Sequence, residues 1–114
     1  MSERTFNIKL KDGDSHELLY DNRALYEFEG IHGETAMRVM SSGNIGFRAI
    51  THLVWAGLIH KEDAPSIDEV IDLVPADDFE GVVKVVIKSL EDALGLDKKA
   101  KAKAVKKAKA GRPA

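Results

Sequence analysis

The sequence contains no cysteine and only three prolines, and aromatic residues make up 6% of its 114 positions. Without thiols it can form neither disulfide bonds nor thiolate sites, and a cytosolic compartment is compatible with that composition. No apolar run approaches the ~18 residues that a membrane-spanning helix requires. Met1–Arg4 is not followed by the apolar stretch of a signal peptide. The four histidines lack the spacing of metal ligands, so we expect no membrane segment, metal or cofactor.

The net charge of −2 conceals an uneven distribution along the chain. Residues 97–114 hold eight lysines or arginines and one acid, whereas the preceding 96 residues hold nine basic and eighteen acidic side chains. The sequence therefore predicts an acidic globular domain over residues 1–95 and a basic, Lys/Ala-rich tail over residues 96–114. Like charges three and four residues apart repel each other, so we expect this tail to be flexible.

The segment Asn44–His60, NIGFRAITHLVWAGLIH, dominates the chain because its second half is apolar without interruption. It is long for a strand, and asparagine is a favoured N-cap, so the pattern predicts a helix over Asn44–His60. One wide apolar stripe of this helix would comprise Phe47, Ile50, Leu53, Val54, Gly57 and Leu58. The opposite side would comprise Ile45, Arg48, His52, Trp55 and Ile59. Such a helix either lies at the centre of its domain or presents its second face to a partner.

The N-terminal residues alternate between apolar and polar in the manner of a β-hairpin, with strands over Thr5–Lys11 and Ser15–Tyr20. A two-residue loop would turn the apolar residues of the second strand to the wrong face. A three-residue loop that ends in Gly13, with that glycine in the left-handed conformation, instead pairs Ile8 with His16. We therefore predict the second register.

Two short helices are predicted between the hairpin and the central helix. The first runs from Arg23 to about Glu29 and would be ended by glycines 30 and 33. The second covers Glu34–Met40, with Met37 and Met40 facing inward.

Two further helices follow the central one. Ser66 and Glu69 have the spacing of a capping box, and Pro75 should stop the helix that they begin near Leu73. The last helix starts near Phe79 and has a clean apolar stripe; Val85 falls off that stripe and should be partly exposed. The predicted fold is α+β and mostly helical, an N-terminal hairpin followed by four to five helices packed around the central apolar helix.

No catalytic motif is recognisable, and we predict that the protein is not an enzyme. His52 and His60, with Glu62 nearby, could be read as a site, but a histidine on the flank of a helix is far more often a packing or surface residue. Trp55 has two interpretations of about equal weight: one more core aromatic, or the anchor of an interface that also uses Ile59 and Ile45.

The basic tail allows an alternative function. A small nucleic-acid-associated protein could bind phosphates through such a tail, since counterion release needs only charge. No aromatic residue is interleaved with the lysines and the rest of the chain is acidic, so we do not expect specific nucleic-acid recognition.

The order of these elements resembles the tail assembly chaperones of long-tailed bacteriophages and of the related gene transfer agents. The resemblance covers roughly residues 5–94. It is carried by NRALYEFEG at 22–30, FRAITHLVWAGLIH at 47–60 and SIDEVIDLV at 66–74. Its most specific parts are the LVWAGL stretch and the SIDEV helix start, and the Lys/Ala-rich tail departs from it.

The resemblance implies a function and a set of partners. Members of this family bind the long, helical, apolar tape measure protein in the host bacterial cytoplasm, and they are absent from the finished virion. They keep that protein soluble and extended while tail tube subunits polymerise around it. In many members a programmed frameshift yields a longer form that recruits the tail tube protein, and this chain would be the short form.

The lysine codons bear on the frameshift. Pairs such as Lys98–Lys99 and Lys106–Lys107 are what an A-rich slippery message would encode. A gene without a slippery heptamer there, or without an overlapping reading frame beyond Ala114, would contradict this interpretation.

The candidate partner-binding residues combine the second face of the central helix with one outlier on the last helix. They are Trp55, Ile59, Ile45, Arg48, His52 and Val85. Self-association into a homo-oligomer would be a competing use of the same face.

Overall fold

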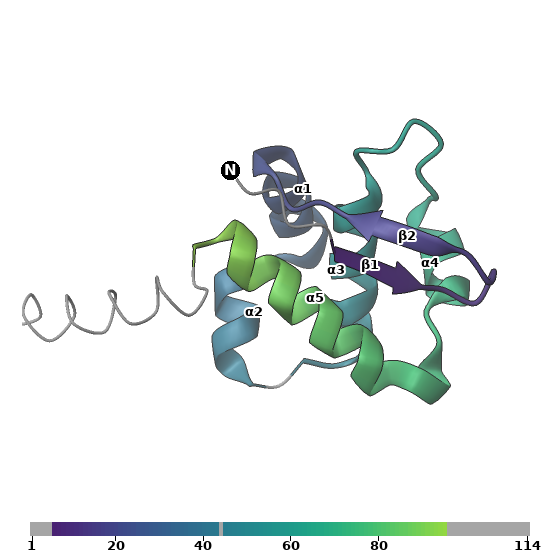
Figure 1. Ribbon diagram of the computed structural model, residues 1–114. Coiled ribbons are helices and arrows are strands. Elements are labelled where there is room, and N and C mark those ends of the chain that lie inside the picture. Colours follow the sequence, from purple (N-terminus) through teal and green to yellow (C-terminus); the bar gives the residue numbers. More distant parts are fainter. Residues whose placement is uncertain (1–5, 44, 96–114) are drawn as a thin grey trace, which may run out of the picture.

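A computed structural model describes residues 6–43 and 45–95 of the chain. An antiparallel hairpin is followed by helices, so the predicted mostly helical α+β fold is confirmed (Figure 1). In chain order the elements are β1 (Phe6–Lys9), β2 (Ser15–Leu18), α1 (Asn22–His32), α2 (Ala36–Ser42), α3 (Phe47–Leu58), α4 (Ile67–Leu73), a 3-10 turn η1 (Ala76–Asp78) and α5 (Phe79–Ala93). The predicted basic tail over residues 96–114 lies outside the described residues, so its flexibility stays a prediction.

The hairpin has the predicted register. Ile8 lies opposite His16, and Gly13 in the three-residue loop has φ +86°, a conformation that other residues rarely adopt. The N–H of Gly13 donates to the Leu10 carbonyl at 2.9 Å and so closes the turn. This register turns the apolar residues of both strands to one side, where they join the core; they are Ile8, Leu10, Leu18 and Tyr20.

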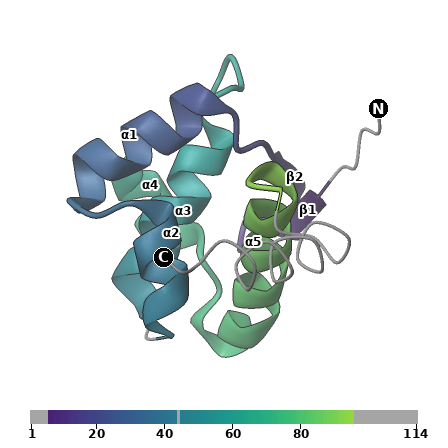
Figure 2. The same cartoon turned by 90° about the vertical axis from the view of Figure 1, so that its left-hand side faces the viewer.

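Helix α3 lies at the centre of the domain and is surrounded by other elements. It contacts α1, α4, α5 and β2, and in Figure 2 the hairpin and α5 lie on one side of it and α1 on the other. Most of its residues are buried. The hydroxyl of Tyr20 donates to the Leu53 carbonyl at 2.6 Å, and the N–H of Leu19 donates to the Gly57 carbonyl at 2.9 Å. Burial raises the pKa of the Tyr20 hydroxyl far above its usual 10.0.

The central helix is shorter than the sequence predicts. It begins at Phe47, with Gly46 as an N-cap that offers no side-chain hydrogen bond, and it ends at Leu58. Asn44, the predicted cap, lies outside the described residues. The prediction that Phe47 joins the buried stripe is also wrong: as the first residue of α3 it is 41% exposed, although its ring stacks on Phe79 at the start of α5.

The two short helices before α3 also differ from their predicted forms. Helix α1 runs straight through Gly30 and ends three residues later, at Gly33 with φ +86°. A single glycine inside a helix lowers the stability of that helix by only about 1 kcal/mol, and the packing of α1 on α3 outweighs this loss. Helix α2 begins after Thr35, and its Ala36 and Val39 face the core. Met37 is 47% exposed and its predicted inward position is wrong, whereas Met40 packs against the core as predicted.

The capping box at the start of α4 is present in full. The Glu69 N–H donates to the Ser66 hydroxyl at 3.2 Å, and the Ser66 N–H donates to the Glu69 carboxylate at 2.8 Å. Helix α4 ends at Leu73, two residues before Pro75, as predicted. Replacing Ser66 by alanine is expected to lower the free energy of unfolding by about 1 kcal/mol, since the cap bond is lost from an exposed site. Urea denaturation checks this, and an unchanged midpoint would contradict it.

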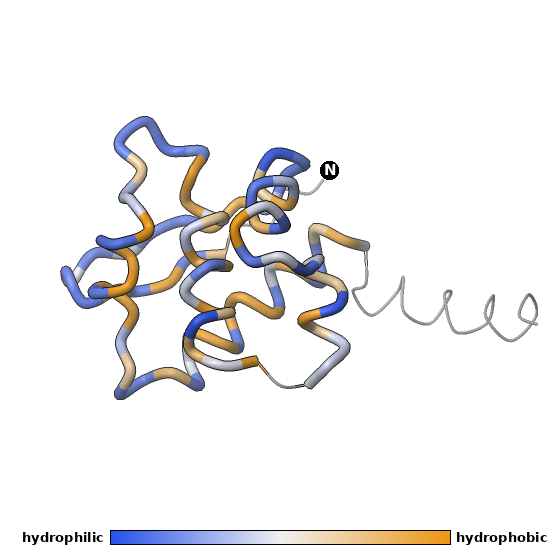
Figure 3. Tube along the Cα trace, turned by 180° about the vertical axis from the view of Figure 1, so that it is seen from behind, coloured by the Kyte–Doolittle hydropathy of each residue, from blue (hydrophilic) through white to orange (hydrophobic). Residues whose placement is uncertain are grey.

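The distribution of polar and apolar residues agrees with this arrangement of the helices and the hairpin. In Figure 3 the loop that joins α3 to α4 is hydrophilic, whereas apolar residues concentrate along the elements of the core. Val85 on α5 is half-buried, so its predicted partial exposure is confirmed. Within the described residues, the helices are all too short or too polar to cross a membrane.

Candidate functional site

One narrow stripe of α3 is less buried than the rest of the helix. It consists of Arg48, His52 and Trp55 and continues to Ile59, the C-cap, at successive spacings of four, three and four residues. These spacings place the four side chains one above another on one helix face. Arg48 is exposed and the other three are half-buried. We call these four residues the α3 stripe.

The rest of α3 is closed to a partner. Apart from Phe47 in the first turn, every other residue of the helix is buried. The structure thus brings together four of the six residues that the sequence singles out. The remaining two, Ile45 and Val85, do not belong to the α3 stripe.

Both outliers have a structural explanation. Ile45 precedes the N-cap Gly46, so it lies outside the helix that was predicted to carry it, and it packs half-buried against the core. Val85 belongs to α5, where it is also half-buried against the core.

Trp55 combines the two interpretations that its sequence position allows. It packs against the core cluster, yet it is not fully buried. An indole in this position presents a rigid apolar surface whose conformation is already fixed by its neighbours. Such a side chain can bind a partner at low entropic cost.

A histidine from α1 meets the α3 stripe. The Nδ1 atoms of His32 and His52 lie 2.9 Å apart, and the His32 ring also stacks on Phe28 at a centroid distance of 4.9 Å. Burial lowers the pKa of His52 below its usual 6.5, and the nearby His32 and Arg48 lower it further. No motif in the sequence singles out His32; the available signal was its position four residues after the buried Phe28, on the same helix face.

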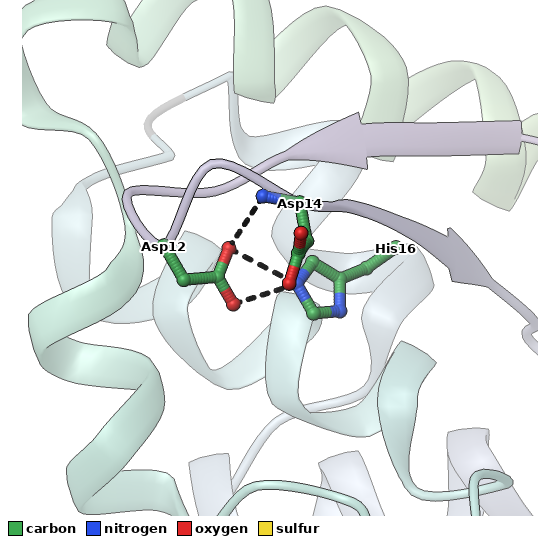
Figure 4. Close-up of side chains that lie close together, drawn as sticks. All are labelled: Asp12, Asp14 and His16. Carbon is green, nitrogen blue, oxygen red and sulfur yellow. Dashed lines mark hydrogen bonds and ion pairs between the residues drawn. The ribbon is translucent and has the colours of Figure 1, made fainter.

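A second group of polar side chains surrounds the hairpin turn (Figure 4). The ligand-type atoms of Asp12, Asp14 and His16 all lie within 4.8 Å of one another. They border an open depression of about 490 Å³ whose lining also includes Lys61, Asp63, Pro65, Glu69, Asp72 and Leu73.

The geometry of this group is explained by the turn itself. Asp12 accepts a hydrogen bond from the Asp14 N–H at 2.9 Å, which holds the pKa of its carboxyl below the usual value, and His16 adds to the effect. His16 Nε2 lies 3.0 Å from the other Asp12 oxygen, and Lys61 Nζ lies 3.1 Å from His16 Nδ1. Both ring nitrogens of His16 are therefore already engaged by the protein. Through His16, these contacts hold the hairpin turn against Lys61 at the start of the α3–α4 loop.

Comparisons of the chain with protein-family models, with curated proteins and with solved structures gave no match. Function is therefore inferred from the chain's own residues. The α3 stripe is polar at its N-terminal end, at Arg48 and His52, and apolar at its C-terminal end, at Trp55 and Ile59, a composition that suits binding.

Proposed function

We propose that this chain is a tail assembly chaperone that holds the tape measure protein of a long-tailed phage, prophage or gene transfer agent while the tail tube assembles. The observation that carries the proposal is the α3 stripe. Trp55 and Ile59 form its apolar part, and Arg48 and His52 form its polar part. It is the least buried face of an otherwise buried helix.

The chemistry of the stripe suits an amphipathic helix as its partner. A straight row of side chains about three and four residues apart fits the groove between the side-chain rows of a second helix. An aromatic anchor flanked by an arginine is also the composition that dominates binding energy at protein interfaces. A tape measure protein is a long series of such helices, so many copies of this chain could cover it.

Three consequences follow from the proposal. The protein acts in the host bacterial cytoplasm and is absent from the mature virion. A longer, frameshifted form of the chain recruits the tail tube protein. A homo-oligomer that uses the same stripe competes with capture of the tape measure protein.

The proposal predicts that Trp55→Ala loses the partner. Wild type and variant are co-expressed with the large, coiled-coil-like protein encoded just downstream, and each is recovered by pull-down. Loss of the indole is expected to weaken capture at least about tenfold, because truncating an anchor of this kind costs about 2 kcal/mol or more of binding free energy and each 1.4 kcal/mol is about tenfold. Circular dichroism must show that both forms are folded.

Tyr26→Ala is the matched control for this experiment. Tyr26 is an aromatic residue of α1 that is 71% exposed and does not belong to the α3 stripe, so its removal should leave capture unchanged. Failure of the wild type to capture the partner would overturn the chaperone proposal. Equal capture by wild type and Trp55→Ala would overturn the assignment to the α3 stripe.

The basic tail favours one second candidate, a nucleic-acid-associated protein. Eight basic residues within residues 97–114 could contact phosphates. Retention on DNA through such contacts falls steeply between low and physiological salt, whereas capture of an apolar helix does not. A chain that fails to bind the tape measure protein but binds DNA in this salt-dependent way would favour the second function.

A further inference from the structure

The His32–His52 pair is a contact between two helices that depends on a shared proton. His32 lies in the last turn of α1 and His52 in the middle of α3. Their rings meet edge to face, with centroids 5.1 Å apart, and their Nδ1 atoms are at hydrogen-bond distance, 2.9 Å. One Nδ1 must therefore donate a proton and the other must accept it.

The number of protons on the pair decides whether this bond can exist. With both rings neutral, one ring carries its proton on Nδ1 and the other on Nε2, and the bond forms. With one ring protonated, the bond becomes charge-assisted and is retained. With both rings protonated, neither Nδ1 can accept, and two positive charges face each other across 2.9 Å. Only this last state is incompatible with the observed contact.

The charges around the pair oppose the second proton. His52 is faced by His32 from α1 and by Arg48 from the preceding turn of α3, and both disfavour a positive charge on its ring. No charged group of β2, α4 or α5, the other described elements packed on α3, is among the causes of the shift in the pKa of His52. Burial acts in the same direction, so every cause of the shift in the pKa of His52 opposes a positive charge on its ring.

We propose that the His32–His52 pair is a proton-responsive latch, which holds the last turn of α1 on α3 while at least one imidazole is neutral and releases it when both are protonated. The latch does not rest on the proposed chaperone function. Release stays local, because the side chains of Ala24 and Phe28 in the preceding turns of α1 are fully buried and hold those turns on the core. Release of this turn would expose the side of the α3 stripe where His52 now contacts His32.

The direction of the pH effect follows from proton linkage. A released His52 takes up a proton near its usual pKa of 6.5, whereas the docked ring resists it. The released state thus binds more protons below that value, so docking is complete at higher pH and is lost progressively as the pH falls through this range.

The test is a histidine-resolved NMR titration of the full chain from about pH 8 to about pH 5. In the wild type, the titration midpoint of His52 should lie below 6.5. In His32→Asn, the His52 midpoint should move up toward 6.5, because one of the causes that lower the pKa of His52 is removed. His60→Gln is the control, because His60 bonds to the Glu17 carbonyl and has no histidine partner among the described residues; this variant should leave the His52 titration unchanged.

Hydrogen exchange measures the release itself. Protection of the amides in the last turn of α1, corrected for intrinsic exchange, should fall several-fold between about pH 7.5 and about pH 5 in the wild type. The double variant His32→Asn/His52→Asn keeps a donor and an acceptor but no titrating group, and its protection should not change with pH. A His52 midpoint that is the same in wild type and His32→Asn, or pH-independent protection in the wild type, would overturn the proposal.

Discussion

Replacing Phe28 by alanine is expected to lower the free energy of unfolding by about 3–5 kcal/mol. Phe28 is the largest fully buried side chain of α1, and its ring also stacks on His32. Its removal leaves a cavity in the core on which α1 packs, and the contact of α1 with α3 is the most extensive helix–helix contact of the described residues. Domains of this size are stabilised by only about 5–15 kcal/mol in total, so the variant should lose a large share of its stability.

Urea denaturation followed by circular dichroism measures this loss. Tyr26→Ala is a matched control, since it removes an aromatic ring from the same helix at a position that is 71% exposed. The control should stay within about 0.5 kcal/mol of the wild type. Similar midpoints for the two variants would show that α1 is not held through Phe28.

The same substitution at two glycines is expected to have opposite effects. Gly57→Ala should destabilise the protein by about 1–3 kcal/mol through overpacking. A Cβ at this position would lie 2.8 Å from Leu18 Cδ2 and 3.0 Å from the Tyr20 ring. Tyr20 cannot withdraw freely, because its hydroxyl is bonded to the Leu53 carbonyl at 2.6 Å. The gain in helix propensity offsets only part of this cost.

Gly30→Ala supplies the contrast. Gly30 lies inside α1, and a Cβ there would meet no atom within 4 Å. The alanine should therefore stabilise the protein by about 0.5–1 kcal/mol, through helix propensity and a less flexible unfolded chain. Thermal denaturation of both variants measures these opposite changes in stability. A Gly57→Ala protein as stable as Gly30→Ala would mean that α3 and the hairpin can move apart at no cost.

Some of the fold follows from local sequence patterns. The hairpin register is fixed because a shift of one residue would turn Leu18 and Tyr20 to solvent, and Gly13 suits the left-handed turn. The start of α4 is fixed because Ser66 and Glu69 satisfy each other's backbone groups within four residues. Both features depend on residues that are close together in the chain, so the sequence alone was sufficient to predict them.

The α3 stripe was predictable for a related reason. Helical periodicity sorts the residues of α3 into faces, and Arg48, His52, Trp55 and Ile59 share one of them wherever the helix is placed. Periodicity does not show where the helix begins, however. Gly46 ends up as the N-cap, so Ile45 was assigned to a face that it does not occupy.

The tertiary structure alone decided which side chains of the short helices face inward and which distant residues meet. In α2, Ala36 and Val39 are buried and Met37 is exposed, because the packing of the helix on the core selects which of its faces points inward. The His32–His52 contact joins residues twenty positions apart, and Gly57 is required by the approach of Leu18 and Tyr20 from β2 and the segment after it. By itself, the sequence determined the elements, the hairpin register and the faces of α3, which depend on nearby residues. Contacts between elements depend on how helices pack across the core, and no local pattern encodes them.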